Sequence, residues 1–180
     1  AVILADGGVI RSEHLPVRPP RVFAFACQNV SPDVLRAMNK PSFDVYEAYE
    51  KDYKEECADL GKDQHLVNYF IVGHPGTSMA EAVELFERLL ERNYSPEQVQ
   101  EFIPLPMTRA NVQYVTGVDP LTRQDVYVPR RERERRIQKA LVRWKDPANK
   151  KLVLEGLAEA GRDDLAKKFL AHPHVRNPRP

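Results

Sequence analysis

The chain has 180 residues, of which 42% are apolar and 29% charged, and its 27 Lys and Arg nearly balance its 26 Asp and Glu. This length and composition are typical of one globular domain with a substantial core. No run of about 18 apolar residues occurs, which excludes a membrane-spanning helix. Two cysteines, Cys27 and Cys57, are too few for a disulfide scaffold, and no secretory leader is visible, so we expect a cytoplasmic protein.

The small net charge hides an uneven distribution along the chain. Residues 130–180 contain 15 Lys and Arg against 7 Asp and Glu, which leaves residues 1–129 net acidic. The basic part either forms a solvated helical surface or meets an anionic partner, such as an acidic protein face or nucleic acid. Trp144 and Phe169 are its only aromatic residues, so base stacking is not favoured and nucleic acid is the weaker choice.

Proline clusters divide the sequence into five segments. The opening segment holds Asp6-Gly7-Gly8, which either turns between two short strands or belongs to a disordered leader. Prolines at the end of the chain exclude a helix there. The predicted segments are a leader or capping segment (1–20), a strand-and-helix unit (21–103), an extended arm with turns (104–130), a helical extension (131–172) and a loose tail (173–180).

The strand-and-helix unit alternates two hydrophobic periodicities. Ser78 and Glu81 form a capping-box pattern ahead of apolar residues at helical spacing, which predicts the start of a helix there. The run 65–72 is nearly continuously apolar, which is typical of a strand in a parallel sheet. The full prediction is strands at 21–26, 65–72 and 99–103 and helices at 31–38, 43–60 and 79–90, with right-handed crossovers. The extension then predicts helices at 133–144, 147–161 and 162–172.

Candidate binding residues follow the predicted strands. In parallel sheets, ligands sit beyond the carboxyl ends of the strands, which here are 27–29, 73–76 and 104–108. Glycine and proline in these segments either only turn the chain or allow a ligand to approach the backbone. His74 titrates in a useful range, although a histidine in a turn is more often structural. No Cys-x-x-Cys, phosphate-binding glycine loop, nucleophile elbow or metal-ligand histidine spacing occurs.

These segments resemble the second half of a radical S-adenosylmethionine (SAM) enzyme, most closely of the YgiQ-type branch. The similarity covers roughly residues 22–165. It is carried by Phe25–Ser31 with Val34–Pro41, Leu66–Thr77 and Val99–Thr108, which are similar to that family's fourth, fifth and sixth strand regions, and by 114–122, 126–130 and 145–149, which resemble its C-terminal extension. The run 66–77 is shared widely among radical SAM proteins, whereas 99–130 is more specific.

The resemblance implies a partial (β/α) barrel that holds SAM and a 4Fe-4S cluster. It also implies cofactor contacts from the strand ends, at Gln28, Val72, Gly73, His74 and Pro104. In the family, three cysteines in a Cys-x-x-x-Cys-x-x-Cys loop hold the cluster. This sequence has no such loop, so the resemblance implies no metal ligand in this chain.

A second departure lies at Cys27-Gln28-Asn29, where the family usually has Pro-Glu-His. The sequence also begins with Ala1 rather than Met, so we expect either a fragment of a larger enzyme or a degenerate relative. Two hypotheses follow. The first is the C-terminal portion of a radical SAM enzyme, inactive alone, whose partner is the missing N-terminal part, another subunit or a second copy. The second is a non-catalytic binding or scaffolding module with a basic helical tail.

Overall fold

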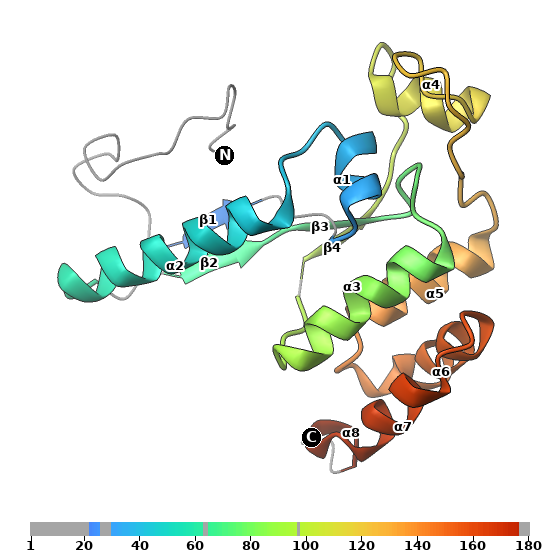
Figure 1. The fold of residues 1–180 in the computed structure, drawn as a ribbon. Helices are drawn as coiled ribbons and strands as arrows, with labels where there is room; N and C mark the ends of the chain where they lie inside the picture. Colours follow the sequence, from blue (N-terminus) through green and yellow to red (C-terminus); the bar gives the residue numbers. More distant parts are fainter. Residues whose placement is uncertain (1–21, 26–29, 63–64, 97, 177–180) are drawn as a thin grey trace.

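The computed structural model describes residues 22–25, 30–62, 65–96 and 98–176. The predicted leader 1–20, the candidate Gln28 with its neighbours Cys27 and Asn29, and the last four residues of the predicted tail lie outside the described residues. In the described part, short parallel strands are accompanied by a larger number of helices (Figure 1).

The strands form two parallel pairs. β1 (Val22–Phe25) pairs with β2 (His65–Asn68), and β3 (Phe70–Val72) pairs with β4 (Val99–Glu101). The parallel pairing agrees with the prediction. Among the described residues a partial barrel is not seen, because each sheet contains two strands there.

The predicted strand 65–72 is divided at Tyr69, which corrects the sequence interpretation. β1 ends level with Asn68, whereas the pairing with β4 begins at Phe70. Tyr69 therefore lies between the part of the segment that pairs with β1 and the part that pairs with β4. The apolar run shows that the segment is extended but carries no information on where each neighbouring strand stops.

Three helices of the strand-and-helix unit lie where they were predicted. α1 (Pro32–Ala37) has Pro32 in its first turn, and α2 (Phe43–Asp59) runs beside β1 and β2 (Figure 1). α3 (Met79–Glu91) begins with a complete capping box. The Ser78 hydroxyl accepts from Ala80 N at 3.2 Å, and Ser78 N donates to Glu81 Oε2 at 2.8 Å. The capping prediction is thereby confirmed.

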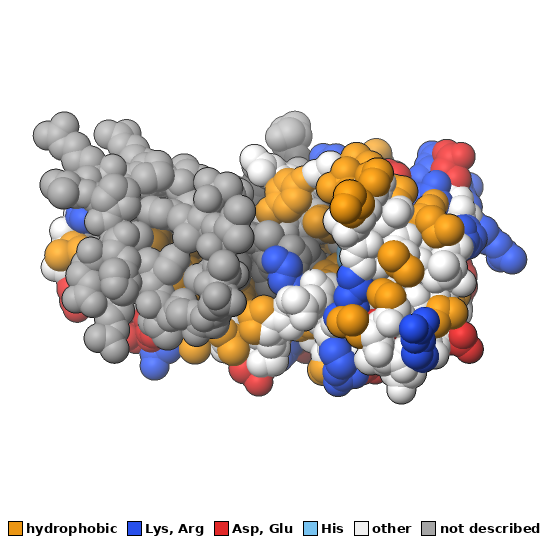
Figure 2. Space-filling view, turned by 90° about the horizontal axis from the view of Figure 1, so that it is seen from above, with side chains coloured by type: hydrophobic (Ala, Val, Ile, Leu, Met, Phe, Trp, Pro, Cys, Tyr) orange, Lys and Arg blue, Asp and Glu red, His pale blue; other side chains and the backbone are white. Residues whose placement is uncertain are grey.

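The predicted extended arm 104–130 contains a helix, which is a second correction. α4 (Arg109–Thr116) is capped by the Thr108 hydroxyl, which accepts from Asn111 N at 3.1 Å, and it ends at Gly117 with a φ of 72°. The prolines that indicated an arm all flank the helix and none interrupts it. α4 stands apart from the other helices in Figure 1 and lies on the side turned toward the viewer in Figure 2.

The C-terminal extension is helical, as predicted, and continues further than predicted. α5 (Glu132–Val142) is followed by a 3₁₀ turn, η2 (Pro147–Asn149), and by α6 (Lys150–Glu159), α7 (Asp163–Ala171) and α8 (Pro173–Arg176). The last of these corrects the prediction of a loose, non-helical tail from residue 173. Pro173 occupies the first helical position, where its missing N–H has no intrahelical partner to lose.

The core lies where α3 meets the extension. α3 packs on α5 and α6, and α6 packs on α7. Gly156 of α6 lets the helices approach, since a Cβ there would lie 2.5 Å from Ile137 Cγ2 of α5. The Phe86 and Phe169 rings join α3 to α7 with their centroids 5.8 Å apart. The extension therefore packs against α3, and its helix α5 also contacts β3 and β4.

Candidate functional site at the strand ends

The carboxyl ends of β3 and β4 lie side by side. Phe102 N donates to Val72 O at 2.8 Å, so the parallel pairing continues one residue past β4. Val72 is buried and leads directly into Gly73 and His74, whereas Pro104 is exposed just beyond β4. The structure thus places four of the five predicted cofactor-binding residues at one edge, and the fifth, Gln28, lies outside the described residues.

His74 is buried at this edge in a fixed orientation. Its side chain is 6% exposed, and its ring meets the Phe102 ring edge to face at 4.9 Å. Nδ1 lies 2.7 Å from the Pro75 carbonyl oxygen. Because a carbonyl only accepts, Nδ1 carries the proton and Nε2 keeps a lone pair in the neutral ring. Nε2 has no hydrogen-bond partner among the described residues, so it is available to accept a hydrogen bond.

Burial lowers the pKa of His74 from its ordinary value of 6.5, and the Pro75 hydrogen bond opposes this only in part. The unfolded chain therefore binds a proton more readily than the folded chain. We expect the stability from this residue to be complete above about pH 6.5 and to be lost as pH falls toward the lowered value. Melting temperatures at pH 7.5 and 5.5 should differ less for His74→Gln than for the wild type. Equal differences would contradict this assignment.

The turn after β3 is held by a buried glutamine of the extension. Gly73 N donates to Gln138 Oε1 at 2.9 Å, and Gln138 Nε2 donates to Thr77 O at 3.0 Å. Gln138 is 1% exposed. Gly73 has a φ of 74°, and a Cβ there would lie 3.0 Å from Arg135 Cδ. One α5 side chain thus fixes both ends of the turn, and glycine is required where it begins.

Replacing Gln138 with leucine should destabilise the protein by about 1–3 kcal/mol, because it leaves a buried N–H and a buried carbonyl unpaired. Gln124→Leu is the matched control, since Gln124 is exposed. Urea denaturation of both variants measures the change. A loss no larger than that of the control would contradict the role assigned to Gln138.

A second polar network holds the segment around α4. Asp119 is 4% exposed and accepts from the Arg109 guanidinium, from Gln113 Nε2 at 2.8 Å, and from two backbone N–H groups of its own loop. The Arg109 hydrogen bond, helped by the others, holds the pKa of Asp119 far below its ordinary range against the effect of burial. The carboxylate therefore stays ionised and fixes the loop 119–122 to α4.

Aromatic and basic side chains continue outward from His74. The Phe102 ring lies 5.7 Å from that of Tyr114, and the Arg130 guanidinium lies 5.4 Å from the Tyr114 centroid. Tyr127 accepts from Gly76 N through its carbonyl oxygen at 2.7 Å, and its hydroxyl donates to Glu134. Burial and that hydrogen bond raise the pKa of Tyr127 to about 12. These contacts connect the β3 turn, α4 and α5 at one edge of the molecule.

The described residues do not form a metal site. No cluster of three or more His, Cys, Asp or Glu side chains placed to hold a metal occurs among them. Cys57 lies half-buried on α2. The described residues therefore supply no set of ligands that fits an iron–sulfur cluster, and Cys27 lies outside them.

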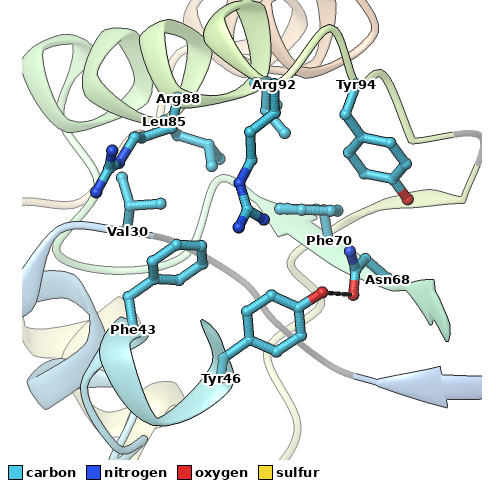
Figure 3. A pocket seen from close by; sticks show the side chains of 10 residues that line it. Val30, Phe43, Tyr46, Asn68, Phe70, Leu85, Arg88, Arg92 and Tyr94 are labelled. Carbon is cyan, nitrogen blue, oxygen red and sulfur yellow. Dashed lines mark hydrogen bonds between the residues drawn. The ribbon is translucent and has the colours of Figure 1, made fainter. Parts of the chain in front are cut away.

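A separate hollow lies between α2 and α3, beside the carboxyl end of β2 at Asn68 (Figure 3). Its volume is about 20 Å³, which accommodates roughly one water molecule. Tyr46 donates to Asn68 Oδ1 at 2.7 Å across it, and the Arg92 guanidinium lies 5.8 Å from the centroid of the Phe43 ring. This hollow is too small for a cofactor. The contacts that line it hold α2 against β2 and the end of α3.

Sequence reasoning missed Gln138 and Asp119. Gln138 lies four residues after Glu134 and four before Val142, and all three are buried. This spacing, beside the main apolar face of α5, was the available indication that Gln138 is buried. Asp119 is followed by Pro120 and by two backbone donors. An aspartate before a proline indicates a turn, but the sequence does not indicate that Arg109 would reach it.

The amino-acid sequence of the chain is similar to part of a group of longer proteins. Residues 97–173 match the family model described as Domain of unknown function (DUF3362). Over 140 residues, or 78% of this chain, the chain is 41% identical to a UPF0313 protein of Clostridium perfringens and 42% identical to one of Methanocella arvoryzae. Its relatives are UPF0313 proteins.

The matched region covers 21% of the clostridial protein and 23% of the methanogen protein. A UPF0313 protein of Methanosarcina acetivorans is 41% identical over the same length, which is 19% of that protein. The chain therefore spans about a fifth of the length of these relatives. Among the residues that the structure describes, no helix is long and apolar enough to cross a membrane.

Proposed function

We propose that this chain is the C-terminal part of a radical SAM protein and that its strand ends form one wall of the SAM site. The observation that carries the proposal is the turn after β3, held in place by Gln138 beside the exit of β4. In parallel sheets this edge is where ligands bind. The resemblance of the run 66–77 to a radical SAM strand and turn supports the cofactor. The match to UPF0313 proteins several times longer supports the part of the proposal that makes this chain a portion of a larger protein.

The residues present fit the adenosine part of SAM. His74 is 6% exposed, and its Nε2 is an acceptor without a partner among the described residues, so an amino or hydroxyl group of a ligand would donate to it. Phe102 orients the imidazole through their ring contact, and Gly73 allows the backbone to take a conformation that other residues rarely adopt. Beside a reduced iron–sulfur cluster, bound SAM supplies radical chemistry.

The cluster itself does not fit this chain. In the proposal its ligands come from another part of the full-length protein, and the two parallel pairs belong to a (β/α) barrel completed by that part. This chain's contribution is to bind and orient the cofactor and to exclude water around it. Alone it is expected to be inactive.

The full-length clostridial relative tests the proposal. After anaerobic reconstitution with iron and sulfide, and with dithionite as reductant, it should convert SAM to 5′-deoxyadenosine. Substitution to valine at the position equivalent to Gly73 should weaken SAM binding at least tenfold. Substitution to alanine at the position equivalent to Leu170, which is exposed on α7, should leave it unchanged. Stoichiometric cluster uptake without SAM binding would overturn the proposal.

A further inference from the structure

Apolar side chains are concentrated on the surface of one segment. Among the described residues, ten large hydrophobic side chains are exposed, and seven of them lie between residues 103 and 127. We call these seven the α4 surface. Figure 2 shows apolar atoms gathered on the face that carries α4. The residues are Ile103, Leu105, Met107, Val112, Val115, Leu121 and Tyr127.

The α4 surface is presented by an ordered scaffold. Asp119 fixes the following loop to the helix through Arg109 and Gln113. Arg130 donates to the Tyr114 carbonyl oxygen at 2.7 Å and to that of Val115 at 3.2 Å, which closes the carboxyl end of α4. These polar contacts hold the backbone of the segment, and its apolar side chains are exposed to solvent. An ordered apolar patch of this kind marks an interaction surface rather than a segment that has failed to fold.

The charges around the α4 surface disfavour a symmetric contact with a second copy. The exposed Arg123, Arg130 and Arg131 flank it, against the exposed acids Asp125 and Glu132, which leaves the rim net basic. Asp119 is buried and already paired with Arg109. A two-fold contact would place the same net basic rim on both sides of the interface, which is unfavourable. The occupant is therefore expected to have an apolar centre and an acidic rim.

We infer that, in the full-length protein, the α4 surface docks onto the rest of the same polypeptide. This is the part that corresponds to the unmatched region of the relatives. About four fifths of each relative lies there, which is ample to cover it. The surface begins directly after β4, so it adjoins the strand edge without depending on any ligand bound there. The inference therefore holds or fails independently of the proposed cofactor.

Site-resolved thiol labelling tests the docking. Cysteine is introduced as Met107→Cys or Val115→Cys in this chain and at the aligned positions of the full-length clostridial relative. Leu170→Cys is the control in both, since Leu170 is exposed on α7, outside the α4 surface. Maleimide labelling is followed at each cysteine by mass spectrometry, and circular dichroism checks that each variant is folded. We expect labelling at the first two positions to be at least tenfold slower in the full-length protein, with no difference at the control.

Equal labelling rates in the two proteins would overturn the inference. Protection already present in the 180-residue chain, and lost on dilution, would also overturn it, because it would assign the α4 surface to a second copy. Sedimentation of the chain at the same concentrations separates this case, since it reports a dimer directly.

Discussion

Replacing Trp144 with alanine should destabilise the protein by about 3–5 kcal/mol, the cost expected for removing a fully buried large aromatic side chain. Trp144 is 1% exposed, and its Nε1 donates to Tyr94 O at 2.9 Å. Its ring lies 4.8 Å from that of His172 and 6.4 Å from that of Phe169. One side chain, just after the end of α5, therefore contacts the segment that follows α3 and the carboxyl end of α7.

Urea denaturation followed by circular dichroism measures this loss. Trp144→Phe should cost less, since it keeps much of the packing and loses the hydrogen bond to Tyr94, and Leu170→Ala should change the free energy of unfolding by no more than about 0.5 kcal/mol. A loss below about 1 kcal/mol for Trp144→Ala would show that the extension does not depend on this contact.

Replacing Asp119 with alanine should destabilise the α4 segment by about 2–4 kcal/mol. The change leaves the Arg109 guanidinium without its counter-charge, and Arg109 Nε already has no partner. Removing one member of a buried pair costs more than the pair contributes. Arg109 is about one-fifth exposed, so the guanidinium retains some access to water, which places the loss at the lower end of the usual range.

Native-state hydrogen exchange of the α4 amides measures this local effect. Asp125→Ala, an exposed acid in the same segment, is the matched control and should leave exchange nearly unchanged. The double variant Arg109→Met with Asp119→Leu should exchange more slowly than Asp119→Ala, because no unpaired charge remains. Additive effects of the two substitutions would contradict the pairing.

The pH dependence of this pair follows from the depressed pKa of Asp119. A carboxylate whose folded-state pKa is lowered stabilises the protein above its unfolded value and loses that contribution as pH falls below it. The contribution should therefore persist throughout the range in which His74 titrates. We expect His74, and His172, whose pKa is also lowered mainly by burial, to contribute to any loss of stability as pH falls from 7.5 to 5.5.

Local patterns predicted much of the fold. The capping box at Ser78 and Glu81 marked the start of α3, and hydrophobic periodicity located α2 and the helices of the extension. These features depend on neighbours within one or two turns of helix, and the sequence displays them directly. The boundaries were less accurate because the break at Tyr69 depends on how far β1 and β4 extend beside it.

The helices α4 and α8 were missed for a different reason. Proline marks the flank of a helix as well as its absence, and Pro106 and Pro173 occupy such flanking or first-turn positions. Gln138 was missed because its partners are backbone groups 61 and 65 residues away. Long-range polar contacts of this kind leave no periodic pattern in the sequence. The spacing of four residues between Glu134, Gln138 and Val142 was only a weak indication that Gln138 is buried.

Photoaffinity labelling tests the central claim, that the ends of β3 and β4 form a wall of the SAM site. An 8-azido-adenosyl analogue of SAM is irradiated with the anaerobically prepared full-length clostridial relative, and the adducts are mapped by mass spectrometry. We expect adducts in the peptides aligned with 66–77 and 99–108, and their loss when excess SAM competes. Adducts that compete with SAM but lie wholly outside the region matched by this chain would contradict the account.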